Sequence, residues 1–438
     1  MIKSFMPALK TAKELKQIQM DGLRWTVNHA YSNSKFYKKK FDGAGVKPEL
    51  IRSLDDIRRL PFTTAEDFRE DYPFPLLSVP MKDVIRIHAS SGTTGKKKVV
   101  CYTRKDIEDW INMFSRCWEL AGLTQEDKVQ IAVGYGLWTA GQGFQLSVER
   151  YGAMAIPTGP GNMDLQCQFL VDFGSTVSAG TASFNLLLGE EVQKRGIKNK
   201  IKLRKATVGA ERTSEAMVKR IKDLLGLDDT LDITGLTELY GPGMGIECAN
   251  HIGHHYWGDY FILEIINPET LEPVCDGEIG EMVYTTLRKE ATPLIRYRSR
   301  DLSRIIPDIC PCGIIMPRHG KLIGRSDDMF IFRAVNIYPS QIDEILSTTQ
   351  GIGSEYQVHL NRHEDGKDSM TIKVERPENK DSCNDQAVKK QVEDRIKKEI
   401  LVSSSVQILD HGVLPRSEGK TKRIFDHRFD ENIISKST

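Results

Sequence analysis

The sequence lacks the long apolar runs and the excess of charge of one sign that are typical of membrane and nucleic-acid-binding proteins. Its longest uncharged stretch, residues 129–148, is interrupted by glycines and glutamines, whereas a membrane-spanning helix needs about 20 mostly apolar residues. The 61 basic and 60 acidic side chains leave a net charge of +1, so we expect no nucleic-acid or membrane partner. Lysines near the N-terminus leave no apolar signal-peptide core, which favours a cytoplasmic location.

Cysteines are also few and mostly scattered. Eight occur in 438 residues, and a large chain without a secretion signal has little need of disulfides. The exception is the pair Cys310 and Cys312, in CPCG, which is too closely spaced for an ordinary disulfide framework. This pair indicates metal ligands instead.

The pattern of apolar residues predicts two domains of different architecture. In the first part, short apolar runs alternate with helical segments, including an amphipathic helix over about 105–121, which indicates an α/β fold. From about residue 326 a short helix, two alternating strands, a lysine-rich helix and a third strand indicate a compact α+β module. We therefore predict a large domain over 1–326 and a small one over 327–438.

The most informative stretch is HASSGTTGKKKVV, residues 88–100, which follows a predicted strand over 84–87. Glycines and hydroxyl residues make a loop with many donors, and Lys96 to Lys98 add positive charge, so the loop can wrap a polyphosphate. The spacing of a Walker loop is absent. A plain hairpin turn is the alternative, because Gly, Ser and Thr favour turns in any case.

With this loop, a series of ordered motifs makes the chain resemble adenylate-forming enzymes of the phenylacetate–CoA ligase type, which have a sister branch of adenylyltransferases acting on a hydroxydeazaflavin cofactor. The resemblance implies a large α/β domain with a small mobile α+β lid. It also implies ATP-dependent activation of an aryl acid as acyl-AMP and transfer to coenzyme A. The motifs are FYKKKFDGAGV (36–46), LPFTTAEDFREDYPF (60–74), RIHASSGTTGKKKVV (86–100), GYGLWTAGQG (134–143), GLTELYGPG (235–243), PLIRYRSRDLSR (293–304), GRSDDMFIFRAVNIYPSQIDEIL (324–346) and LPRSEGKTKR (414–423).

The resemblance also implies roles at matching positions. Glu238 would bind Mg²⁺, a hard cation that prefers oxygen ligands, and the Lys420 ammonium would stabilise the charge gathered in the in-line attack at the α-phosphate. Asp327 corresponds to the hinge about which the small domain rotates, delivering Lys420 in one orientation and presenting residues 333–339 to the thiol in the other. The positions implied to contact ATP are Ser90, Ser91, Gly92, Thr93, Thr94, Gly95 and Lys96 at the β- and γ-phosphates, Asp301 at the ribose, and Glu211, Thr237 and Arg325 elsewhere on the nucleotide.

The same comparison implies where the acid binds. Residues 134–143 resemble the segment that lines the aryl-acid site, with Tyr135 and Trp138 as walls. Aromatic residues most often fill cores, but here they alternate with glycines, which open space for a flat ligand. Ala210, with Glu211 beside it, is implied to lie near the adenine and acid sites.

A structural Zn²⁺ site is predicted from the cysteine pair and its upstream neighbours. Three thiolates, from Cys248, Cys310 and Cys312, and one imidazole make a suitable tetrahedral set. The pattern of some relatives favours His255 as the fourth ligand, with His254 as the alternative. An ordinary turn with reduced cysteines is the competing interpretation.

Two residues depart from the family pattern. Thr234 replaces a tyrosine whose ring stacks on adenine, and Ala334 replaces a glycine where the pantetheine arm enters. The adenylation half-reaction is therefore better supported than transfer to CoA. The rival interpretations are an adenylyltransferase with a different acceptor and a non-catalytic nucleotide-binding protein, and relatives suggest a homodimer.

Overall fold

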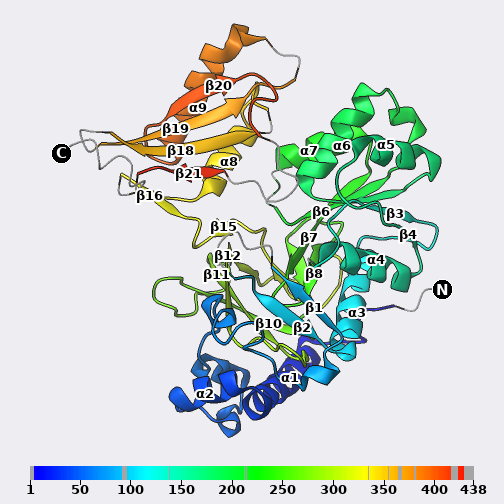
Figure 1. Ribbon diagram of the computed structural model, residues 1–438, viewed down its shortest axis with the longest axis vertical. Coiled ribbons are helices and arrows are strands. Elements are labelled where there is room, and N and C mark those ends of the chain that lie inside the picture. Colours follow the sequence, from blue (N-terminus) through cyan, green and yellow to red (C-terminus); the bar gives the residue numbers. More distant parts are fainter. Residues whose placement is uncertain are drawn as a thin grey trace. The chain divides into compact units, whose positions relative to one another are not determined.

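The computed structural model describes residues 4–90, 96–137, 139–211, 213, 215–333, 335–353, 355–363, 367–378, 381–415 and 423–428. The chain forms two compact units (Figure 1). The first comprises Met1–Ala210 and Arg220–Leu322, and the second comprises Glu211–Lys219 and Ile323–Thr438. The division at 326/327 stays a prediction of where the moving part of the chain begins.

The first unit is built on a sheet of nine described strands. Its five parallel strands are each connected through helices or loops, and the remaining strands extend it in antiparallel fashion. The spatial order is β13 (Ile305–Ile306), β14 (Arg318–His319), β9 (His254–Tyr256), β8 (Gly241–Glu247), β7 (Asp229–Leu236), β6 (Lys205–Gly209), β5 (Val177–Ala179), β3 (Lys128–Ile131) and β4 (Met154–Ile156).

Smaller antiparallel assemblies complete the strands of this unit. One pairs β1 (Arg86–Ala89) with β2 (Val99–Tyr102), and another joins β10 (Phe261–Ile266), β11 (Gly280–Thr286) and β12 (Tyr297–Ser303). The register shifts between Glu281 and Val283, which marks an irregularity in β11 opposite β12.

Helix α3 (Arg104–Leu120) shows how the local sequence sets the element bounds. Thr103 and Asp106 form a reciprocal capping box at its start. At its end Gly122 adopts a φ of +64°, and the amides of Gly122 and Leu123 bond back to the last turn, as in a Schellman motif. The predicted helix is confirmed, and its apolar face lies in the core: Ile107, Trp110, Ile111, Phe114, Trp118 and Ala121.

Further helices cover the sheets of the first unit. Helix α3 packs against α4 and β8, and the N-terminal helix α1 contacts β11 (Figure 1). No helix among the described residues is long and apolar enough to cross a membrane. The remaining helices of this unit are α1 (Ala12–Asn33), α2 (Lys35–Gly43), α4 (Ala140–Tyr151), α5 (Met163–Asp172) and α6 (Ala182–Lys194), with short 3₁₀ turns at Pro48–Leu50, Leu54–Arg59, Glu66–Phe68, Met81–Asp83 and Lys198–Lys200. Helix α7 (Glu215–Leu225) is divided between the two units at Lys219 and Arg220.

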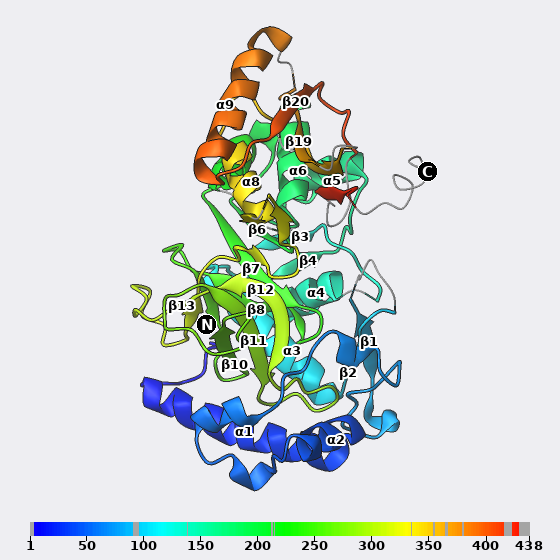
Figure 2. The ribbon, with the colours of Figure 1, turned by 90° about the vertical axis from the view of Figure 1, so that its left-hand side faces the viewer.

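The second unit is the predicted α+β module. Helices α8 (Pro339–Ser347) and α9 (Asp385–Glu399) pack beside a sheet of order β20-β19-β18-β21. Figure 2 labels both helices together with β19 and β20. The apolar residues predicted to point inward share one core, including Ile342, Val358, Ile372 and Ile396. Its strands are β15 (Gly324–Arg325), β16 (Phe330–Phe332), β17 (Val335–Ile337), β18 (Tyr356–Arg362), β19 (Asp368–Glu375), β20 (Ser405–Leu409) and β21 (Ile424–Asp426), with a 3₁₀ turn at Ser382–Asn384.

The predicted fold class is confirmed, and the differences are local. The strand predicted over 84–87 begins two residues later, because the ladder of β1 with β2 starts at the pair Arg86 and Tyr102. Strand β21 was not predicted, since three residues carry too little alternation to stand out.

Candidate functional site

The predicted phosphate loop connects the two strands of the β1–β2 hairpin. Residues Ser91, Gly92, Thr93, Thr94 and Gly95 lie outside the described residues. At the two ends of the loop, the Ser90 amide donates to the Lys98 carbonyl at 3.0 Å, and the Lys96 ammonium lies 5.0 Å from the centre of the Tyr72 ring. The buried Ser90 hydroxyl has no hydrogen-bond partner among the described residues. The described ends of the loop thus join two antiparallel strands, and the phosphate-binding role stays a prediction.

Glu238 lies in the turn between β7 and β8 and is only 5% exposed. Its carboxylate pairs with the Lys98 ammonium and accepts a hydrogen bond of 3.3 Å from the Tyr297 hydroxyl. Burial alone raises the pKa of this carboxyl, but the charge and hydrogen bond of Lys98 outweigh it, so the pKa lies below its usual range. The carboxylate is therefore ionised and available to a cation.

Lys98 is a partner that the sequence analysis did not single out. The sequence presents three consecutive lysines as one group, and the family resemblance places only Lys96 at the phosphates. In the structure it is Lys98, adjacent to β2, that pairs with Glu238. The sequence signal for this role was that Lys98, unlike Lys96, lies directly before the apolar residues of β2.

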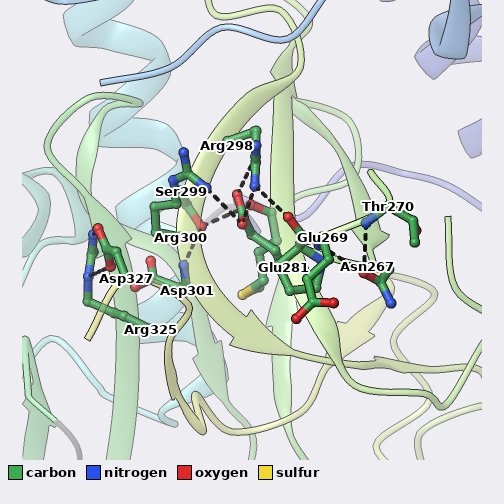
Figure 3. A network of polar contacts seen from close by, with 12 residues as sticks. Asn267, Glu269, Thr270, Glu281, Arg298, Ser299, Arg300, Asp301, Arg325 and Asp327 are labelled. Atoms are coloured by element: carbon green, nitrogen blue, oxygen red, sulfur yellow. Dashed lines mark hydrogen bonds and ion pairs between the residues drawn. The ribbon is translucent and has the colours of Figure 1, made fainter. Parts of the chain in front are cut away.

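Asp301 lies on β12, four residues beyond Tyr297, next to a cluster of buried charges (Figure 3). Both Arg298 and Arg300 point to Glu281, which is fully buried: Arg298 donates two hydrogen bonds of 2.8 Å, and Arg300 donates one of 3.5 Å. The Asp301 amide donates to the Ser299 hydroxyl at 3.1 Å.

The backbone is strained immediately before Asp301. Arg300 has a φ of +69°, a left-handed conformation that costs a non-glycine residue about 1–2 kcal/mol. Its side chain is bound to Glu281, so the ion pair and the backbone conformation support each other. Asp301 thus follows directly after a backbone bend at Arg300, whose side chain is bound to Glu281.

The segment predicted to line the acid site packs on strand β1. The amide of Ala89 and the His88 ring both donate to the Leu137 carbonyl, at 3.0 and 3.1 Å. The Tyr135 hydroxyl and His88 Nε2 are buried without a hydrogen-bond partner among the described residues. Burial raises the pKa of Tyr135 to about 12 and lowers the pKa of His88 to about 4, so both are neutral near pH 7.

Ser90, at the start of the predicted phosphate loop, has a buried hydroxyl without a partner among the described residues, which a ligand could satisfy. Gly141 faces Tyr135 so closely that a Cβ atom there would lie 2.5 Å from the ring. Trp138 lies outside the described residues. Ala210 is exposed, with a φ of +66°, and Glu211 beside it is half-buried.

The remaining nucleotide positions are described only in part. Thr237 is half-buried in the same turn as Glu238. In the second unit, Arg325 forms a two-point ion pair with the predicted hinge residue Asp327, at 2.8 and 2.9 Å (Figure 3). Lys420 and Ala334 lie outside the described residues.

The four predicted metal ligands converge in the first unit. The sulfurs and the ring nitrogen of Cys248, His255, Cys310 and Cys312 all lie within 4.8 Å of one another. The two sulfurs of Cys248 and Cys310 are 3.6 Å apart, and the Cys312 sulfur is 3.3 Å from His255 Nε2. The alternative ligand, His254, faces Asp232 instead, at 3.4 Å.

Comparisons with known proteins show the family to which these motifs belong. Residues 23–286 match the AMP-binding enzyme family, and residues 334–428 match the AMP-binding enzyme C-terminal domain. The phenylacetate-coenzyme A ligase of Escherichia coli K12 is 43% identical over 96% of this chain and 96% of its own length. That of Thermus thermophilus is 36% identical, over 97% of this chain and 99% of its own length. A crystal structure of 2-hydroxyisobutyryl-CoA ligase with an acyl-AMP superimposes with a TM-score of 0.88, at 24% identity over 98% of this chain and 94% of that one, which shows the shared fold.

Proposed function

Since the chain belongs to the phenylacetate–CoA ligase family of AMP-forming acid–thiol ligases, we propose that it activates an aryl carboxylic acid with ATP and transfers the acyl group to coenzyme A. In the first half-reaction an acid oxygen attacks the α-phosphorus of ATP, and pyrophosphate leaves. In the second the CoA sulfur attacks the acyl carbon, and AMP leaves. Phenylacetate and related arylacetates are the proposed acids.

The observation that carries the proposal is the buried, ionised carboxylate of Glu238 beside the phosphate-loop hairpin. An anion with this little exposure needs a cation, and among the described residues the Lys98 ammonium pairs with it. Mg²⁺ bound to ATP would bridge phosphate oxygens and neutralise their charge. Glu238 would supply a protein oxygen to that ion, which frees the Lys98 ammonium for the phosphates.

The other roles follow the family pattern. The loop residues from Ser90 to Lys96 would bind the β- and γ-phosphates, and Asp301 would accept hydrogen bonds from the ribose. Lys420 would stabilise negative charge on the α-phosphate during the attack. Glu211, Thr237 and Arg325 would contact the rest of the nucleotide, and Asp327 would be the hinge of the small domain.

We propose that Tyr135, Trp138 and Ala210 form the acid pocket. The packing of residues 134–137 on β1 supports this, because it sets Tyr135 beside the strand that leads into the phosphate loop. A carboxylate held there would be close to the phosphates that it must attack.

Acid-dependent exchange between ATP and pyrophosphate tests this function. We expect exchange with arylacetates, its loss in Lys420→Ala and Glu238→Gln, and a thioester only when CoA is added. Exchange that yields no thioester would favour a different acceptor and implicate Ala334. ATP binding without exchange on any acid of an aryl and alkyl panel would contradict the proposal and favour a non-catalytic role.

We also propose that the cysteine–histidine cluster holds a structural Zn²⁺. Two thiolates on one tetrahedral zinc, each about 2.3 Å from the metal, lie about 3.8 Å apart, close to the 3.6 Å between Cys248 and Cys310. The second ring nitrogen of His255 donates to the Met316 carbonyl at 3.0 Å, which directs the Nε2 lone pair toward Cys312. All four positions are then used, so the ion would stabilise the fold rather than react.

Metal analysis of protein purified without added metal tests the zinc site. We expect about one equivalent of zinc, its loss in Cys310→Ser, and no change in the control Cys383→Ser, whose cysteine is exposed. Less than about half an equivalent, with full stability in a chelator, would contradict the site. By family resemblance we further propose that the protein is cytoplasmic and forms a homodimer. Light scattering can check the dimer.

A further inference from the structure

Lys289 is a fully buried lysine that follows β11, and none of the roles described above involves it. Its ammonium donates to the backbone carbonyls of Glu238, at 3.3 Å, and Leu239. It lies 4.6 Å from the centre of the Tyr102 ring and 4.7 Å from that of Tyr240. A lysine is almost never fully buried without strong partners, so this position requires an explanation.

The neighbouring carbonyls of the same turn are bound by a second buried side chain. The Tyr102 hydroxyl lies 2.9 Å from the Tyr240 carbonyl and 3.5 Å from the Thr237 carbonyl. The carbonyls of four consecutive residues, 237–240, therefore all face donors on Lys289 and Tyr102. In the turn that carries Glu238, the carboxylate proposed to bind the metal, every backbone carbonyl thus faces a donor from a buried side chain.

Lys289 is itself anchored. The buried carboxylate of Asp106, at the start of α3, accepts hydrogen bonds from the amides of Glu290 and Ala291, at 2.7 and 3.0 Å. The backbone beside Lys289 is thus bound to the start of α3, and the Lys289 side chain binds the turn in its place relative to that helix.

We infer that Lys289 is a positioning residue that orients the Glu238 carboxylate toward the metal of MgATP. Tyr102 assists by binding other carbonyls of the same turn. This inference rests on the proposed function, because it assumes that Glu238 binds the metal. Lys289 touches no substrate. Its contribution is to hold the backbone of the turn, and with it the Glu238 carboxylate, in a single conformation.

ATP binding measured by calorimetry, with and without Mg²⁺, tests the inference on the full-length protein and needs no turnover. In Lys289→Met, whose side chain has similar length and no donor, we expect the gain in ATP affinity from Mg²⁺ to fall by about tenfold, as for other residues that orient metal ligands. ATP affinity without Mg²⁺ should change by less than about threefold, and the KM for the acid should stay near that of wild type. Lys289→Arg should restore part of the gain.

Lys205→Met is the matched control, since the Lys205 ammonium also donates to a backbone carbonyl, that of Ala121, away from the turn. It should leave the Mg²⁺-dependent gain unchanged. A folded Lys289→Met protein that retains the full gain overturns the inference. If Lys289→Met does not fold, Tyr102→Phe decides: it keeps the ring and removes the hydroxyl, so we expect a loss of about threefold, and an unchanged gain again overturns the inference. Failure of the proposed function would appear separately, as absence of acid-dependent exchange in the wild type.

Discussion

The buried charge cluster around Glu281 makes a strong prediction about the nucleotide site. Glu281 is fully buried, and its carboxylate accepts three hydrogen bonds from Arg298 and Arg300 (Figure 3). The change Glu281→Gln keeps the size of the side chain and removes its charge. The amide group then places N–H donors against guanidinium donors, and the Arg298 side chain, 11% exposed, is left without its counter-charge.

The cost follows from these contacts. Removing one partner of a buried ion pair typically destabilises a protein by about 3–5 kcal/mol, because the remaining charge stays desolvated. At about 2 °C or more per kcal/mol for a large domain, the melting temperature should fall by at least about 6 °C. The strained backbone of Arg300 also loses its support, so Asp301 beside it should become less well placed for the ribose.

Two measurements check this prediction: thermal unfolding, and the affinity for ATP compared with 2′,3′-dideoxy-ATP. Glu281→Gln should lower the melting temperature and reduce the preference for the ribose hydroxyls by about tenfold. Glu272→Gln is the control, since Glu272 is exposed and such changes cost less than about 0.5 kcal/mol. A melting temperature within about 2 °C of this control would refute the argument that Glu281 is an essential counter-charge.

Three further predictions concern other parts of the first unit. The pKa of His88 is about 4 in the folded protein and about 6.5 in the unfolded chain, so the unfolded state binds the proton first as the pH falls. The His88 contribution to stability is therefore complete above about pH 6.5 and is lost as the pH falls below that value. In urea unfolding, wild type should lose about 1.4 kcal/mol more than His88→Gln between pH 8 and pH 5.5. Gly141→Ala would place a methyl 2.5 Å from the Tyr135 ring, so the KM for the aryl acid should rise about tenfold while ATP affinity holds. Asp106→Asn removes the carboxylate that accepts hydrogen bonds from the amides of residues 290 and 291 and that caps α3. The free energy of unfolding, measured in urea, should fall by roughly 2–4 kcal/mol.

Much of the fold could be predicted because its signals are local. The cap residues, the apolar face and the terminal glycine of α3 all lie within about 20 neighbouring positions of the sequence, and each is visible in the sequence alone. The same holds for the second unit, where period-two strands and a period-four helix share one core. The three cysteine ligand candidates were identified from residue type and spacing, whereas the choice of His255 came from the resemblance to relatives.

The supporting residues of the site could not be predicted, because their partners are distant in the sequence. Lys98 and Glu238 are 140 positions apart, and Lys289 contacts the turn at 237–240 from the segment after β11. The sequence places Lys98 next to an apolar strand, but it does not show which distant carboxylate the lysine meets. The sequence identified residue types with chemical roles, whereas burial and pairing, which decide those roles, required the tertiary structure.

Strand β2 shows why the loop and the turn should act together. Side chains two positions apart on a strand point to the same face. Val100 and Tyr102 follow this spacing on β2, and Lys98 lies directly before the strand. Lys98 pairs with the carboxylate of Glu238, Tyr102 binds carbonyls of the same turn, and Val100 is fully buried between them. Strand β2 and the residue before it therefore contact both the Glu238 side chain and the backbone of the turn. We expect a displacement of β2 to disturb both of these contacts.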